Sequence, residues 1–82
     1  MLLDVIEFKI LDDYEILITF ENNESRKFSC KHLLNERPFH ILKDKILFNR
    51  VFLEHGTLCW PNDIDIAPEY LYKHSLKIEA AS

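Results

Sequence analysis

Alternating apolar and polar residues near the start of the chain restrict its fold more than any other feature. Residues 5–11 place Ile6, Phe8 and Ile10 on one face and charged side chains on the other. Residues 14–21 repeat this pattern. A period of two residues is typical of a strand with one buried face, so we predict two half-buried β-strands here.

Short polar pairs separate these segments. Asp12-Asp13 and Asn22-Asn23 are the predicted turns, and a third strand over residues 25–30 points Phe28 and Cys30 inward. Connections this short join antiparallel neighbours. The first part of the chain therefore predicts a three-stranded meander.

The middle of the chain changes period. Residues 31–35 are expected to form a single turn against the sheet, and Pro38 begins a predicted helix that carries Leu42 and Ile46 at helical spacing and ends near residue 45. From Ile46 to Phe52 the apolar residues fit both a helix and a strand. Gly56 and the β-branched and aromatic neighbours favour a strand from Phe48. His55-Gly56 then turns the chain into a second arm over residues 57–60.

Trp60 and the residues after it predict a corner. We expect the Trp60 indole to be buried with its N–H bonded to an acceptor. Pro61 lacks a backbone donor, so strand pairing should stop there. Asn62-Asp63 should turn the chain, because both residue types tolerate positive φ.

Pro68 then begins a short closing helix that ends at about Lys73. The predicted order is β-β-β-α-β-β-α. It describes an α+β fold with a mostly antiparallel sheet of about five strands and helices on one face. Residues 1–74 would form one domain, and residues 75–82 a loosely ordered C-terminal tail.

The run from Trp60 to Tyr72 carries a Trp-Pro, an acidic-aliphatic pair, a Pro-Glu and a Leu-Tyr. It resembles the C-terminal signature of the bacterial family called domain of unknown function 2442. Upstream, Tyr14 with its alternating strand, Phe28-Ser29 and Leu42-Lys43-Asp44 also resemble that family. Asp63 departs from it, because the family usually has glycine there, and a turn with positive φ would strain the aspartate.

This resemblance implies no biochemical activity. It does imply a small protein encoded beside a second short protein, as in toxin–antitoxin-like pairs. Longer relatives add a helix-turn-helix domain, which this resemblance associates with transcription regulation.

Composition narrows the possible functions. The chain has 82 residues, 48% of them hydrophobic, and a net charge of −4. An acidic domain lacks the positive surface that binds nucleic acid, and it is equally unsuited to an anionic membrane. No apolar run is long enough to span a bilayer, and the N-terminal residues do not resemble a signal peptide. Two isolated cysteines favour a reducing, cytoplasmic location.

Catalytic patterns are missing from the sequence. It has no glycine-rich phosphate loop, no nucleophile elbow and no zinc-protease helix motif. We therefore expect no enzyme activity and no cofactor. Cys30, His32, His55 and Cys59 are a permitted zinc set, but their spacing is unusual, and buried thiols with exposed histidines are the favoured interpretation.

Charged clusters have simple structural interpretations. The acidic residues after Trp60 are expected to have structural roles instead of holding a cation. Asp63 would hydrogen-bond within the turn, Asp65 would hydrogen-bond at the helix start, and Glu69 would interact with the helix dipole. Basic residues near the third predicted strand are expected to be a solvated face, with a docking surface for an acidic partner as the alternative: Arg26, Lys27, Lys31 and His32.

The leading hypothesis is a non-enzymatic module that binds another small protein or a second copy of itself. Open sheets leave edge strands that can accept a partner's strand. The candidate contact residues are Trp60, Tyr70, Tyr72 and Lys73. The alternatives are a ligand-sensing or transcription-regulatory accessory domain and, third, a zinc-binding or enzymatic protein.

Overall fold

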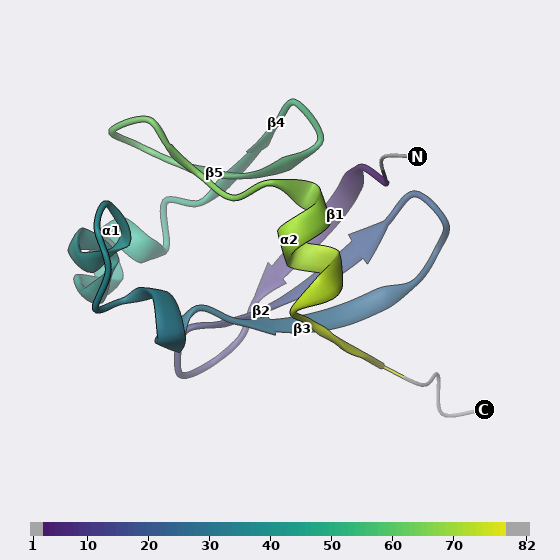
Figure 1. The fold of residues 1–82 in the computed structure, drawn as a ribbon, viewed down its shortest axis with the longest axis horizontal. Helices are drawn as coiled ribbons and strands as arrows, with labels where there is room; N and C mark the ends of the chain where they lie inside the picture. The colour runs from purple at the N-terminus through teal and green to yellow at the C-terminus, as the bar shows by residue number, and fades with distance from the viewer. Residues whose placement is uncertain (1–2, 79–82) are drawn as a thin grey trace.

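The computed structural model describes residues 3–78, which form an α+β fold of seven antiparallel strands in two sheets (Figure 1). The larger sheet has the order β1 (Val5–Ile10), β2 (Glu15–Phe20), β3 (Ser25–Ser29) and β7 (Leu76–Lys77). The smaller sheet has the order β4 (Phe52–Glu54), β5 (Thr57–Trp60) and β6 (Ile64–Asp65). The predicted class and antiparallel pairing are confirmed, while the single sheet of about five strands is replaced by two sheets.

The β1–β2–β3 meander is confirmed, with one irregularity in β1. Val5 pairs with Phe20 and Glu7 pairs with Thr19, so Ile6 is an extra residue in a β-bulge. The bulge puts Val5 in the core and leaves Ile6 exposed. The prediction that Ile6 shares the buried face is therefore wrong.

Positive φ angles accompany the hairpin connections, at Asp13 (61°), Tyr14 (63°), Asn23 (67°), His55 (54°), Gly56 (73°), Asn62 (72°) and Asp63 (61°). Three of the predicted turns therefore lie where expected, and the first is displaced by one residue. The Glu15 N–H donates to the Asp12 carbonyl across that turn (3.2 Å), which places Tyr14 in the turn and not in the strand.

The connection between the sheets contains three short helices. The single turn predicted over residues 31–35 is confirmed as a 3-10 turn, η1 (Lys31–Leu33), and it places Leu33 and Leu34 in the core. The helix predicted from Pro38 is divided into a 3-10 helix, η2 (Phe39–Lys43), and α1 (Lys45–Phe48).

Asp44 causes this division. Its backbone is extended (ψ 110°), and its side chain accepts a hydrogen bond from the Ile46 N–H (2.9 Å), so it caps a new helix. Residues 48–51, for which a strand was favoured, lie at the end of α1 and in the connection after it, and β4 begins at Phe52. Ile46, expected on the buried helix face, is exposed.

The C-terminal part differs most from the prediction. Pairing stops at Pro61 as expected but resumes in β6, which was not predicted. Helix α2 (Pro68–Lys73) is confirmed with Pro68 at its first turn, and it connects the two sheets (Figure 1). Ser75 is buried and the β7 residues pair with β3, so residues 75–78 do not form a loose tail. Residues 79–82 of that predicted tail lie outside the described residues.

One hydrophobic core joins both sheets. The larger sheet contributes Ile16, Ile18 and Phe28, and the smaller contributes Leu58 and Trp60. The two sheets thus bury their inner faces together, which removes their apolar side chains from water. No helix within residues 3–78 combines the length and the apolar content needed to cross a membrane.

Candidate interaction surfaces

Trp60 fills the centre of the core. Its side chain is 1% exposed, and its indole N–H donates to the Phe48 carbonyl (2.9 Å). The predicted burial and the predicted acceptor are both confirmed. This burial also means that Trp60 cannot contact a partner from its present position, so it is removed from the candidate contact residues.

Tyr70 and Tyr72 are both half-buried. The Tyr72 ring packs edge-on against Phe20, with 5.1 Å between ring centres. The Tyr70 hydroxyl is hydrogen-bonded to His32 Nε2 (2.8 Å), and its ring centre lies 4.2 Å from that of His74. Tyr72 therefore holds α2 against the larger sheet, Tyr70 connects α2 to η1, and Lys73, which follows Tyr72, is exposed.

The four residues of the zinc hypothesis do not form a metal site. Within residues 3–78, no three His, Cys, Asp or Glu side chains are arranged to hold a metal ion. Cys30 is buried after β3, His32 is occupied by Tyr70, and His55 lies in the β4–β5 turn with Cys59 in the following strand.

Both cysteines are poorly suited to ionise. Burial raises the pKa of the Cys30 thiol to about 12. For Cys59, burial first and then the nearby Asp65 and Glu54 carboxylates raise the pKa above its usual value of 9.0. A protonated thiol is neither a good metal ligand nor a good nucleophile.

The acidic residues after Trp60 lie in different elements. Asp63 is in the turn, Asp65 pairs with Cys59 in β6, and Glu69 is in the first turn of α2. The predicted helix-start bond from Asp65 is wrong. Ala67 occupies the N-cap position, and no side chain caps that helix.

Each residue of the predicted basic patch contacts another side chain, which for His32 is Tyr70. Lys27 lies 3.9 Å from a Glu15 oxygen, and Lys31 forms an ion pair with Asp13. Arg26 points to the opposite face, where it contacts Ser75 and the Tyr72 ring. These contacts favour the solvated-face interpretation over a docking surface for an acidic partner.

Large hydrophobic side chains are exposed mainly at sheet edges, a feature that the sequence analysis missed. The exposed fractions are 52% for Ile6, 79% for Ile46, 40% for Phe52, 70% for Leu76 and 41% for Ile78. Except for Ile46, these residues lie in or directly after β1, β4 and β7, each of which is the terminal strand of its sheet.

Clefts beside α2 and on the smaller sheet also have apolar side chains in their lining. An apolar cleft of about 230 Å³ lies between η1 and α2 and is lined by Leu33, Phe39, Asp65, Ile66, Ala67 and Tyr70. Another of about 230 Å³ lies on the smaller sheet, where Phe52 and Cys59 are bordered by Glu54, Asp63 and Asp65.

Comparison with protein families gives a match over most of the chain. The sequence matches the family model described as Protein of unknown function (DUF2442) over residues 5–77. No curated protein and no solved structure matches the chain.

Proposed function

This chain belongs to the DUF2442 family, and from that premise we propose that it is a non-enzymatic protein-interaction module of the bacterial cytoplasm. Its partner would be another small protein or a second copy of the chain. A product of a neighbouring gene, as in a toxin–antitoxin-like pair, is the first partner to test.

Exposed hydrophobic side chains on edge strands carry this proposal. Soluble proteins usually protect sheet edges with charges, prolines or covering loops, because an open edge accepts another strand. Here Ile6, Phe52 and Leu76 are exposed on β1, β4 and β7. Each of these strands has a neighbour within its sheet on one side only. On β1 part of this edge is occupied, because the Val5 N–H donates to the Gly56 carbonyl (2.8 Å). Along the remaining edges a partner strand could form main-chain hydrogen bonds and cover the apolar side chain.

The apolar cleft beside α2 favours a second candidate function, ligand sensing by an accessory domain. Its lining residues include Leu33, Phe39 and Tyr70. Its volume of about 230 Å³ is below the range of roughly 300–1,000 Å³ typical of small-molecule sites. Protein interaction is therefore the leading proposal.

Charged substitutions at the edges test the proposal. We would make Ile6→Lys, Phe52→Lys and Leu76→Lys separately, since exposed positions tolerate change within about 0.5 kcal/mol. Ile46→Lys is the matched control, because Ile46 is exposed on a helix. The measurements are sedimentation velocity of the purified chain and its stoichiometric recovery with the adjacent gene product.

We expect association in one of these two assays, lost in at least one edge variant and kept in Ile46→Lys. A monomer at every concentration that also fails to bind the neighbouring product would contradict the proposal. Equal loss in the control variant would also contradict it.

A further inference from the structure

We propose that the outer face of the β4–β5–β6 sheet binds an extended, arginine- or lysine-rich protein segment. This inference rests on the proposed interaction function and names the surface and the chemistry of the partner. It depends on the geometry of the face, on its unpaired carboxylates and on the free edge of β4.

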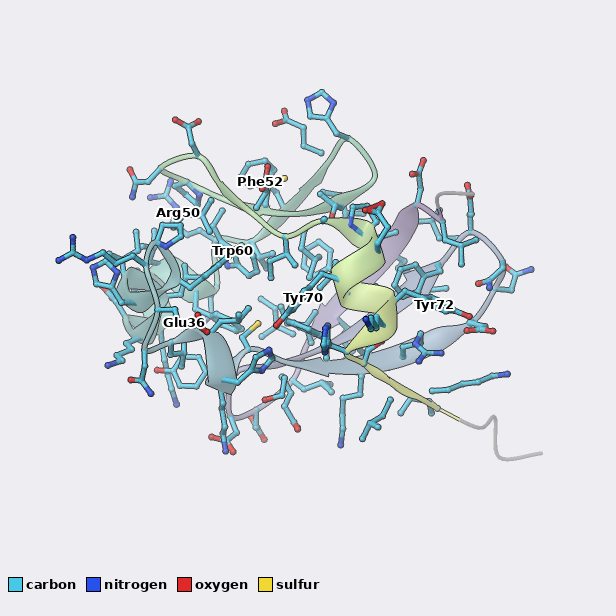
Figure 2. All side chains as sticks on the ribbon, viewed as in Figure 1. Glu36, Arg50, Phe52, Trp60, Tyr70 and Tyr72 are labelled. Atoms are coloured by element: carbon cyan, nitrogen blue, oxygen red, sulfur yellow. The ribbon has the colours of Figure 1, made fainter. Side chains whose placement is uncertain are left out.

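The strand register defines this outer face. Phe52 pairs with Cys59, and Cys59 pairs with Asp65, so these three side chains form one row across the sheet. Glu54 is two residues after Phe52 and shares its face. Trp60 belongs to the opposite face, and Figure 2 shows Phe52 and Trp60 on opposite sides of the hairpin.

The carboxylates of this face form no ion pair with the part of the chain that the structure describes. Within residues 3–78, the ion pairs connect Arg26, Lys27, Lys31 and Lys77 with Glu24, Glu15 and Asp13. None of them involves Glu54, Asp63 or Asp65, although all three line the cleft beside Phe52. The field of two of them reaches Cys59, whose pKa is raised first by burial and then by Asp65 and Glu54.

An exposed aromatic ring among unpaired carboxylates complements a guanidinium or ammonium group. A cation over the Phe52 ring gains a cation–π contact, and a guanidinium can also donate two hydrogen bonds to one carboxylate. The cleft of about 230 Å³ beside Phe52 gives the side chain a place to enter. Phosphate groups would be repelled here, which disfavours nucleic acid.

The free edge of β4 explains why the segment should be extended. β4 is a terminal strand of its sheet, paired only with β5. A partner strand added to β4 would project alternate side chains over the outer face, because side chains alternate along a strand. A segment with a basic residue at every second position fits this spacing.

A peptide titration tests the inference. The probe is a capped nonapeptide of alternating arginine and valine, and the matched probe replaces each arginine with glutamate. Amide chemical shifts of the chain are followed at low salt, where charge interactions are least screened. We expect saturable shifts along β4, β5 and β6 with the arginine peptide and none with the glutamate peptide.

A pair of charge-matched variants locates the site. Glu54→Gln with Asp65→Asn should weaken binding of the arginine peptide about tenfold, which corresponds to about 1.4 kcal/mol. Glu7→Gln with Glu21→Gln removes the same charge from exposed positions elsewhere and should leave the affinity within about twofold.

Absence of saturable binding by the arginine peptide would overturn the inference, as would equal weakening in both double variants, which indicates attraction to net charge alone. These failures differ from failure of the proposed function. If the peptide does not bind but Leu76→Lys or Ile6→Lys abolishes association, the interaction function remains and only this surface is wrong.

Discussion

Asp63 has a backbone conformation that is unfavourable for residues with a side chain. Its φ of 61° lies in the left-handed region, where a side chain is unfavourable and glycine is not. The family resemblance indicated glycine at this position, and the structure shows why. The short Asn62-Asp63 turn between β5 and β6 needs positive φ at both residues.

We expect Asp63→Gly to raise the free energy of unfolding by about 0.5–1 kcal/mol, because strain is relieved and the added chain entropy of glycine offsets part of the gain. Asp63→Ala is the control and should lower it by about 1 kcal/mol, since alanine tolerates positive φ less well than aspartate. Urea unfolding measures both changes. A glycine variant less stable than the wild type would contradict this interpretation.

Cys30 makes stability depend on alkaline pH. In the folded chain its pKa is about 12, against a usual value of 9.0, because burial disfavours the thiolate. Burial therefore contributes stability below pH 9, and this contribution is lost as the pH rises from about 9 towards 12. The unfolded chain binds fewer protons than the folded chain over that range.

The slope from one such group is about 1.4 kcal/mol per pH unit. We therefore expect wild-type stability to fall between pH 9 and pH 10.5 more steeply than that of Cys30→Val, which lacks the thiol. Urea unfolding of both proteins at each pH isolates the contribution of Cys30, because the variant keeps every other ionisable group. Parallel curves would show that the thiol ionises normally in the folded chain.

At the scale of elements, Arg26 attaches the end of the described chain to the larger sheet. Its Nε donates to Ser75 Oγ (2.8 Å) and its Nη2 to the Ser75 carbonyl (2.9 Å). Its guanidinium carbon lies 4.3 Å from the centre of the Tyr72 ring. One side chain of β3 thus connects to α2 and to the residue before β7, which explains why β7 pairs instead of fraying.

We expect Arg26→Met to lower the free energy of unfolding by about 2–3 kcal/mol, since it removes charged hydrogen bonds but keeps most of the apolar stem. Amide hydrogen exchange at residues 75–78 should accelerate more than exchange in β1 and β2. Lys27→Met is the control, because Lys27 lies on the other face of β3 with a longer contact to Glu15. Equal effects of the two substitutions would contradict this role for Arg26.

At the scale of the whole molecule, the shared core decides the arrangement. Leu58, Trp60 and Ile64 of the smaller sheet belong to the same cluster as Ile16 and Phe28 of the larger. The outer faces of the two sheets take no part in this core, so they are available to solvent or to a partner. The proposed interaction function therefore depends on a core that buries only the inner faces of the two sheets.

Local chemistry determined much of this fold from the sequence. Period-two alternation located β1, β2 and β3, Pro68 located the start of α2, and asparagine, aspartate and glycine located the turns. These features depend on neighbours a few residues apart, so the chain alone contains the information. Burial of the Trp60 indole and its bonded N–H followed from its amphipathic side chain.

Only the tertiary structure decided the division into two sheets, the bulge at Ile6, the pairing of β7 with β3 and the inward turn of Arg26. Each depends on contacts between residues distant in sequence, where many pairings satisfy the same local pattern. The candidate binding surface could not be predicted from the sequence for the same reason. The row of Phe52, Cys59 and Asp65 exists only because three strands meet in one register, and register is set by the face that packs into the core.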